Sequence, residues 1–173
     1  EEGPVYRRRY IDWGLFYVEQ NFFNLWRRHE RVLRQRNQSL KQRVPRGEVE
    51  AWNPEFIATA EALHKLRQQH VLALEKKVQL WIAELLEAEH FMFSFSAGWN
   101  EQLGLEAVLS EGYEGERKMG FTHAGPQRAE LRVRFKNREA RTHVSRGQQK
   151  MLAVAMTLAQ AELVAETLGQ API

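Results

Sequence analysis

Two long stretches in the first half of the chain place apolar side chains three or four residues apart, which is the period of an α-helix. The first stretch covers residues 19–42, and the helix breakers Pro45 and Gly47 follow it. The second covers residues 53–89 and opens on Asn53-Pro54, an N-cap residue followed by proline at the first helical position. Because only a short polar loop joins the two stretches, we expect an antiparallel helical hairpin.

The apolar stripe of the first helix has one polar interruption, because Arg36 or Asn37 stands where the spacing requires an apolar residue. We expect the stripe of the first helix to face part of the stripe of the second in a coiled-coil-like arrangement. The positions that form them are Phe22, Trp26, His29, Leu33 and Leu40 in the first helix, and Phe56, Ala60, Leu63, His70, Leu74, Trp81, Leu85 and Ala88 in the second.

The pattern changes after residue 89. HFMFSF, residues 90–95, alternates apolar and polar side chains and predicts a strand, with a turn at SAGWN and a short helix over 101–111 after it. The glycine-rich EGYEGERKMGF predicts a loop. Residues 131–135 alternate again, and KNR predicts a hairpin turn before a returning strand at 139–143. A helix over 146–168, ended by Gly169 and Pro172, completes the series.

The amino-acid composition argues against several classes of protein and of functional site. The chain has no cysteine, which excludes a disulfide framework and thiolate chemistry. No apolar run reaches the roughly 18 residues that a membrane-spanning helix requires, and EEGPVYRRRYIDW does not resemble a secretory leader. The six histidines show no His-x-x-x-His spacing with a carboxylate, so we predict no metal site.

The formal net charge of +3 is unevenly distributed. Residues 27–46 hold eight cations against the single acid Glu30, residues 84–116 hold eight glutamates and no cation, and residues 117–150 are basic again. Clustered cations attract polyanions. The alternative is a solvated helix face, or pairing with the acidic segment. The candidates for contact with such a polyanion are Arg27, Arg28, Arg31, Arg34 and Lys41.

THVSRGQQK, residues 142–150, leads into the last predicted helix. A helix N-terminus exposes unpaired N–H groups and carries a partial positive charge. Capping explains Ser145, but it does not explain Gly147 in the first turn, where glycine costs about 1 kcal/mol relative to alanine. Glycine does let a ligand approach the backbone closely. The start of this helix is therefore a candidate phosphate-binding site.

Four stretches together resemble the RecF family of bacterial recombination mediators. VSRGQQK, continued by MLAVAMTLAQAEL, resembles the ABC-ATPase signature pattern [LS]SxGQ in the form that this family has. GFTHAGPQRAEL resembles its GxTxxGPHRxDL segment, RRRYIDWGLF its RRxFLDW stretch and LRQRNQSLK its QRNxLLK stretch. The four occur in the expected order and cover nearly the whole chain. Gln127 and Glu130 stand where the family usually has histidine and aspartate, so no family role is carried over to them.

Two ATPase motifs of that family do not occur in the sequence. There is no GxxxxGK[ST], and the only aspartate is Asp12, so there is no paired-carboxylate Walker B strand. In the family these motifs lie before RRxFLDW and after the segment matching LGQAPI. We therefore expect the chain to be a middle piece of a longer, weakly active DNA-dependent ATPase, and to be inactive alone because it lacks the phosphate cradle and the metal-binding carboxylate.

The resemblance implies an α+β, mostly helical fold, with a long antiparallel helical arm on a partial ATPase head of the SMC and ABC type. Residues 1–18 would form the head–arm junction, 19–89 the arm and 90–173 the C-terminal part of the head. ATP and Mg²⁺ would join two heads into a homodimer. Ser145, Gly147 and Gln148 would then contact the nucleotide of the partner head, and Arg146 would lie at the dimer interface.

The resemblance also implies a cytoplasmic DNA-repair protein. Members of the family bind DNA at gaps and at single-strand/duplex junctions. They act with RecR and RecO and help to load RecA in gap repair, replication restart and the SOS response. Two alternatives stay open: a non-enzymatic helical hairpin that binds a protein partner, and the ATPase head of a transporter, in which an arm of this length would be unusual.

Overall fold

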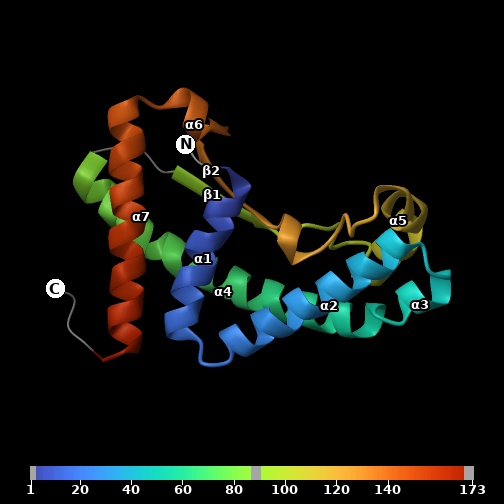
Figure 1. Cartoon of the computed structure of the whole chain (residues 1–173). Coiled ribbons are helices and arrows are strands. Elements are labelled where there is room, and N and C mark those ends of the chain that lie inside the picture. Colours follow the sequence, from blue (N-terminus) through green and yellow to red (C-terminus); the bar gives the residue numbers. More distant parts are fainter. Residues whose placement is uncertain (1–2, 87–90, 170–173) are drawn as a thin grey trace. The chain divides into compact units, whose positions relative to one another are not determined.

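The computed structural model describes residues 3–86 and 91–169 (Figure 1). The fold is α+β and mostly helical, which confirms the predicted class. The long helices are α1 (Pro4–Val18), α2 (Phe22–Gln42), α4 (Asn53–Leu86), α5 (Leu105–Met119) and α7 (Arg146–Thr167), and the short ones are α3 (Arg46–Glu50), η1 (Pro126–Arg128) and α6 (Ala140–His143). The strands are β1 (Phe91–Ser96), β2 (Glu130–Phe135) and β3 (Arg138–Glu139).

The chain divides into two compact units. Unit 1 consists of residues 1–20, 67–95 and 130–173, and unit 2 of residues 21–66 and 96–129. Helix α4 contributes its first turns to unit 2 and the rest to unit 1. The predicted division into junction, arm and head concerns roles in a longer protein, and it stays a prediction.

Unit 1 combines α1, most of α4 and α7 with a sheet of order β1-β2-β3. Strands β2 and β3 are antiparallel, with Arg134 opposite Glu139. Lys136 and Asn137 both have positive φ, of 49° and 61°, so a two-residue turn joins the strands as KNR predicted. Helix α1 packs along α7 (Figure 1). The core of this unit includes Val78, Ile82, Phe91 and Ala155.

Buried polar contacts hold the helices of unit 1 together. Arg67 donates from Nε and Nη2 to the two carboxylate oxygens of Asp12, each over 2.8 Å. The His70 ring nitrogen Nε2 lies 3.1 Å from Gln160 Oε1, and Gln160 Nε2 donates to the Tyr10 carbonyl oxygen over 3.3 Å. Burial lowers the pKa of His70 and raises that of the Tyr10 hydroxyl, which donates to the Met156 carbonyl oxygen. These bonds join α1, α4 and α7.

Unit 2 contains the antiparallel pair that the apolar stripes predicted, formed by α2 and the first turns of α4. Arg36, late in α2, donates to Asn53 Oδ1 at the start of α4 over 2.9 Å. His29, about two turns earlier in α2, has its Nδ1 2.9 Å from Thr59 Oγ1, which lies further along α4, so the two helices run in opposite directions. Side chains from α5 complete the core of this unit. Its buried members include Val32, Leu33, Phe56, Ala60, Leu105 and Leu109.

The structure differs from the predicted secondary structure at three places. The glycine-rich segment predicted as a loop belongs to α5, because Leu109, Tyr113 and Glu116 repeat at helical spacing and are buried. The predicted returning strand over 139–143 stops after two residues, and α6 follows with Ala140 buried in the core of unit 1. Helix α1 was not predicted, because Ile11, Gly14 and Leu15 are its only buried residues.

The boundaries of the other helices shift by a few residues. Helix α2 begins at Phe22 rather than at residue 19, and the end predicted for the second long helix, residues 87–89, lies outside the described residues. Helix α7 ends at Thr167. Among the described helices, none combines the length and apolar character that crossing a membrane would require.

Candidate functional site

Helix α7 starts at the predicted place, and its first turn is closed by two reciprocal hydrogen bonds. Ser145 is the N-cap residue, and its Oγ accepts from the Gln148 backbone N–H over 3.2 Å. The Gln148 side-chain oxygen accepts from the Ser145 N–H over 2.9 Å. This capping box satisfies two of the four N–H groups that a helix start leaves without an intrahelical partner.

The other two N–H groups of this turn belong to Arg146 and Gly147. Within the described residues neither has a hydrogen-bond acceptor, and Ser145, Arg146 and Gly147 are all exposed. A Cβ atom added at Gly147 would meet only Ser145 Oγ, at 3.8 Å, which is an ordinary contact. The chain itself therefore does not require glycine at this position. The helix end can donate two hydrogen bonds to an anion.

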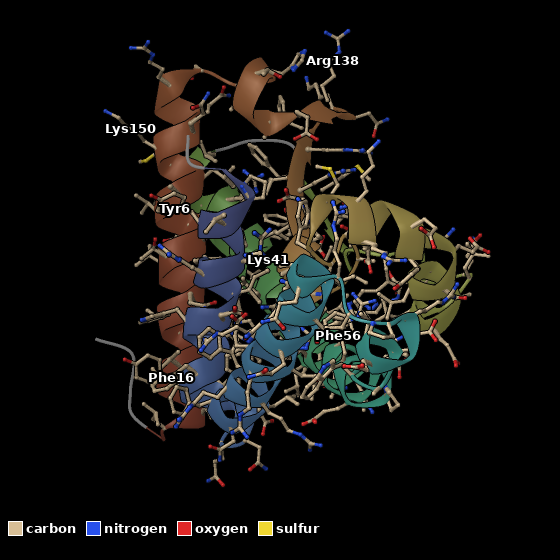
Figure 2. All side chains as sticks on the ribbon, turned by 45° about the vertical axis from the view of Figure 1, so that its right-hand side comes forward. Tyr6, Phe16, Lys41, Phe56, Arg138 and Lys150 are labelled. Carbon is tan, nitrogen blue, oxygen red and sulfur yellow. The ribbon has the colours of Figure 1, made fainter. Side chains whose placement is uncertain are left out.

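The start of α7 is held in place from both sides. Val144, the residue before the cap, is buried against the core of unit 1, and Leu152 anchors the second turn of the helix. Gln149 Nε2 donates to the Val144 carbonyl oxygen over 3.2 Å. Figure 2 shows Lys150 and Arg138 projecting outward at the same end of unit 1. Packing and hydrogen bonds within unit 1 thus fix the position of the exposed helix start.

The candidate DNA-binding residues all lie on α2, and each is exposed. At 3.6 residues per turn, Arg27, Arg31, Arg34 and Lys41 fall within roughly 80° of one another around the helix axis. Arg28 lies about 60° beyond Arg31 around the axis, at the edge of this face, and pairs with Glu55 Oε1 at 2.7 Å. We call the four-residue face, Arg27, Arg31, Arg34 and Lys41, the basic stripe of α2.

Sequence reasoning missed a buried ion pair in unit 2. Arg36 is fully buried, and its Nη1 donates to Glu116 Oε2 and to Thr122 Oγ1, each over 2.7 Å. Glu116 Oε1 accepts from the His123 backbone N–H over 2.8 Å. The signal was present, because Arg36 interrupts the stripe of α2 between Leu33 and Leu40 at a position that faces the core.

Side chains in and just after GPQR, residues 125–128, form hydrogen bonds or ion pairs with other parts of the chain. Gln127 Nε2 donates to the Ala124 carbonyl oxygen over 3.0 Å, and Glu130 pairs with Arg7 Nε at 2.8 Å. Gly125 has a φ of 133°, and an added Cβ would lie 2.8 Å from Phe56 Cζ. Among the described residues, no group of His, Asp and Glu side chains is arranged to hold a metal ion.

No family model matches the chain. The DNA replication and repair protein RecF of Chromohalobacter salexigens is 39% identical over 171 residues, 98% of this chain and 47% of the relative. RecF of Coxiella burnetii (strain CbuK_Q154) is 36% identical over 99% of the chain, and RecF of Pseudomonas fluorescens is 35% identical over 96%. Over this part of their length, the chain is a homologue of the RecF proteins. It spans about half the length of the curated relatives it matches.

Two solved structures agree with this RecF assignment at the level of the fold. A structure described as the recombination mediator protein RecF-ATP in the RecFOR pathway superimposes with a TM-score of 0.89 over 100% of this chain and 50% of its own, at 22% identity. A second, described as RecF-ATPrS, superimposes with a TM-score of 0.92 over 99% of this chain. The described fold is therefore that of one half of RecF.

Proposed function

We propose that the chain is the part of a RecF-type recombination mediator that contacts ATP through the start of α7. Two observations on this chain support the proposal: the N–H groups of Arg146 and Gly147 are exposed and lack an acceptor among the described residues, and nothing in the fold requires Gly147. The sequence match to RecF relatives and the fold match to a RecF-ATP structure also support it.

The proposed contact is made in trans. The nucleotide would be held with Mg²⁺ by the phosphate loop and Walker B carboxylate of a partner head. Arg146 and Gly147 would donate their N–H groups to the γ-phosphate, and the positive end of the helix would add a favourable field. Ser145 and Gln148 would act mainly by closing the capping box, which aims the two free donors outward. Arg146 would place its guanidinium at the dimer interface.

A full-length RecF-type protein carrying this segment tests the proposal. Ser145→Arg places a bulky cation at the cap and should abolish ATP-dependent dimerisation, measured by analytical ultracentrifugation. Gly147→Ala should weaken dimerisation, because the methyl group blocks close approach of the phosphate. Lys150→Ala, one turn further along, is the matched control and should dimerise normally. Normal ATP-dependent dimerisation of Ser145→Arg would contradict the assigned role.

We further propose that the basic stripe of α2 contacts the DNA backbone. Its four exposed cations share one side of the helix, so they can follow a single line of phosphates. Each Lys or Arg that neutralises a duplex phosphate contributes about 0.9 to the slope of log K against log salt. We therefore expect Arg31→Ala with Arg34→Ala to weaken duplex binding and to lower that slope by about 2.

Arg28→Ala provides the control for the DNA experiment, because Arg28 already pairs with Glu55. It should change neither the affinity nor the slope. Because Arg28→Ala removes one cation and the double variant two, a loss for Arg28→Ala about half as large as that of the double variant would show general charge reduction and not a site. Fluorescence anisotropy over a series of salt concentrations is the measurement.

The wider role is part of the same proposal. We infer a cytoplasmic protein of DNA repair and replication that prefers gaps and single-strand/duplex junctions. It would act with RecR and RecO to help load RecA in replication restart and the SOS response. The relatives named DNA replication and repair protein RecF, and a structure described as part of the RecFOR pathway, support this role.

A further inference from the structure

Unit 2 carries an open groove of about 960 Å³ between the first turns of α4 and the start of α5. Apolar side chains from both elements line it, among them Ile57 on α4 and Leu105 on α5. No residue of the basic stripe of α2 or of the start of α7 lines the groove. Neither part of the proposed function therefore uses it.

Leu103 borders this groove and is 52% exposed. The turn that carries it is ordered by its own hydrogen bonds. Asn100 Oδ1 accepts from the Gln102 N–H over 3.0 Å, and the Asn100 carbonyl oxygen accepts from the Gly104 N–H over 3.2 Å. A single exposed leucine is ordinary. Here, however, a rigid turn holds it at the rim of an apolar groove, where it can serve as an anchor for a partner.

The charged side chains that line the groove are all glutamates. Glu61 and Glu106 are exposed and form no ion pair among the described residues. Arg46 offsets the charge of the third, Glu50, at 2.7 Å, and also reaches the lining residue Ser110 at 3.5 Å. None of the described lining residues is a lysine or an arginine. This negative charge opposes the net charge of +3 of the whole chain. The negative potential disfavours a nucleic acid and favours a cationic ligand.

We propose that this groove binds a basic amphipathic helix of a partner protein. Its apolar side chains would pack against Ile57, Leu103 and Ala107, and its lysines or arginines would face Glu61 and Glu106. An amphipathic helix recognised by an apolar groove uses anchors at i, i+3 or i+4, and i+7. An open groove fits such a segment better than a small molecule, whose sites enclose most of the ligand surface.

A synthetic peptide of roughly 14 residues tests this proposal on the 173-residue chain. The probe has leucines at helical anchor spacing and lysines elsewhere, and a second peptide replaces each lysine with glutamate. In a ¹⁵N NMR titration, the lysine peptide should shift the amide signals of Ile57, Leu103 and Glu106, and the glutamate peptide should not. Failure to shift these signals with millimolar lysine peptide overturns the proposal.

Variants make the test specific. Leu103→Ala, and Glu61→Lys with Glu106→Lys, should each weaken the lysine peptide about tenfold, the loss expected for an interface anchor. Leu80→Ala and Glu84→Lys are matched controls, because both residues are exposed on α4 in unit 1. They should leave the affinity within about twofold. Equal weakening by test and control variants overturns the proposal. So does a DNA duplex that, without any peptide present, shifts the amide signals of Ile57 and Leu103, because this would assign the groove to nucleic acid.

Discussion

Gly14 in α1 faces two side chains of unit 1 at very short range. A Cβ atom added there would lie 1.5 Å from Gln160 Nε2 and 2.5 Å from His70 Nε2. Gln160 cannot move aside without losing its bonds to His70 and to the Tyr10 carbonyl. We therefore expect Gly14→Ala to destabilise the chain by about 1–3 kcal/mol, as overpacking does. Urea unfolding followed by circular dichroism measures the change.

Gly112 supplies the control for Gly14. It also lies inside a helix, α5, but an added Cβ there would have no atom within 4 Å. Gly112→Ala should therefore stabilise the chain, by up to about 1 kcal/mol, because alanine has the higher helix propensity. The same sign of change at both glycines would show that the close approach at Gly14 does not govern its stability.

The Arg36–Glu116 pair gives a second prediction at the scale of residues. Both side chains are buried, at 0% and 1% exposure, so removing one partner leaves a buried charge without its counterion. We expect Arg36→Met or Glu116→Leu alone to cost about 3–5 kcal/mol of unfolding free energy. The double variant should recover part of this loss, because it removes the unpaired buried charge, while Asn53 Oδ1 and the His123 N–H still lose their partners. Denaturant unfolding of the four proteins completes a double-mutant cycle.

An exposed pair in the same unit serves as the control for this cycle. Arg46 and Glu50 lie at 2.7 Å, but their side chains are 47% and 39% exposed. Solvent screens such a pair, so Glu50→Gln should change stability little. A loss for Glu50→Gln as large as that for Glu116→Leu would mean that burial is not what makes the Arg36 pair important.

At the scale of elements, the spacing of apolar residues predicted the helices whose buried face is regular. It did not predict the elements whose secondary structure depends on packing against other parts of the chain. Leu33 and Leu40 locate α2, and Ser145 locates the start of α7, because a stripe or a cap is a local signal. Helix α5 contains Gly112, and its burial against α2 outweighs the cost of glycine. Strand β3 ends early because Ala140 enters the core of unit 1, which no local pattern shows.

Two variants at the start of α7 can distinguish a residue that stabilises the fold from one that is proposed to contact the ligand. Ser145→Ala removes the acceptor of the Gln148 N–H and should cost about 1 kcal/mol. Gly147→Ala should instead leave stability unchanged or raise it, because an added Cβ meets only an ordinary contact at 3.8 Å. Thermal unfolding of both variants is the measurement. Destabilisation by Gly147→Ala would show that the fold itself requires this glycine.

At the scale of the whole molecule, the candidate site was predictable in place but not in its details. THVSRGQQK indicated an exposed helix start, and the structure has Ser145, Arg146 and Gly147 exposed there. The spacing of Ser145 and Gln148 is also the sequence signature of a capping box, so this bond could have been predicted, although only the capping role of Ser145 was. The sequence could not separate Arg28 from its neighbours, since the partner Glu55 belongs to another helix.

The stability of the folded chain should depend on pH in two separate windows. His70 is buried against Gln160, and burial lowers its pKa below the ordinary value of 6.5. The unfolded chain therefore takes up a proton near that pH while the folded chain does not, so stability should fall as the pH drops below about 6.5 and through the folded pKa. The hydrogen bond to Gln160 and, less strongly, the negative charge of Asp12 partly oppose this lowering of the His70 pKa.

The second pH range, in which stability depends on Glu162, lies at more acidic pH. Its hydrogen bond from Lys77, at 2.8 Å, lowers the pKa of Glu162 below 4.5, so its contribution is present above that pH and is lost as the pH falls through the folded pKa. Urea unfolding at a series of pH values separates the two groups. His70→Gln keeps an amide donor for Gln160 and should remove only the loss of stability below about pH 6.5. Glu162→Gln should remove only the loss of stability that Glu162 causes below pH 4.5. If His70→Gln retains the full decline, the proton is taken up elsewhere, and the buried His70–Gln160 contact does not link the folding of unit 1 to pH.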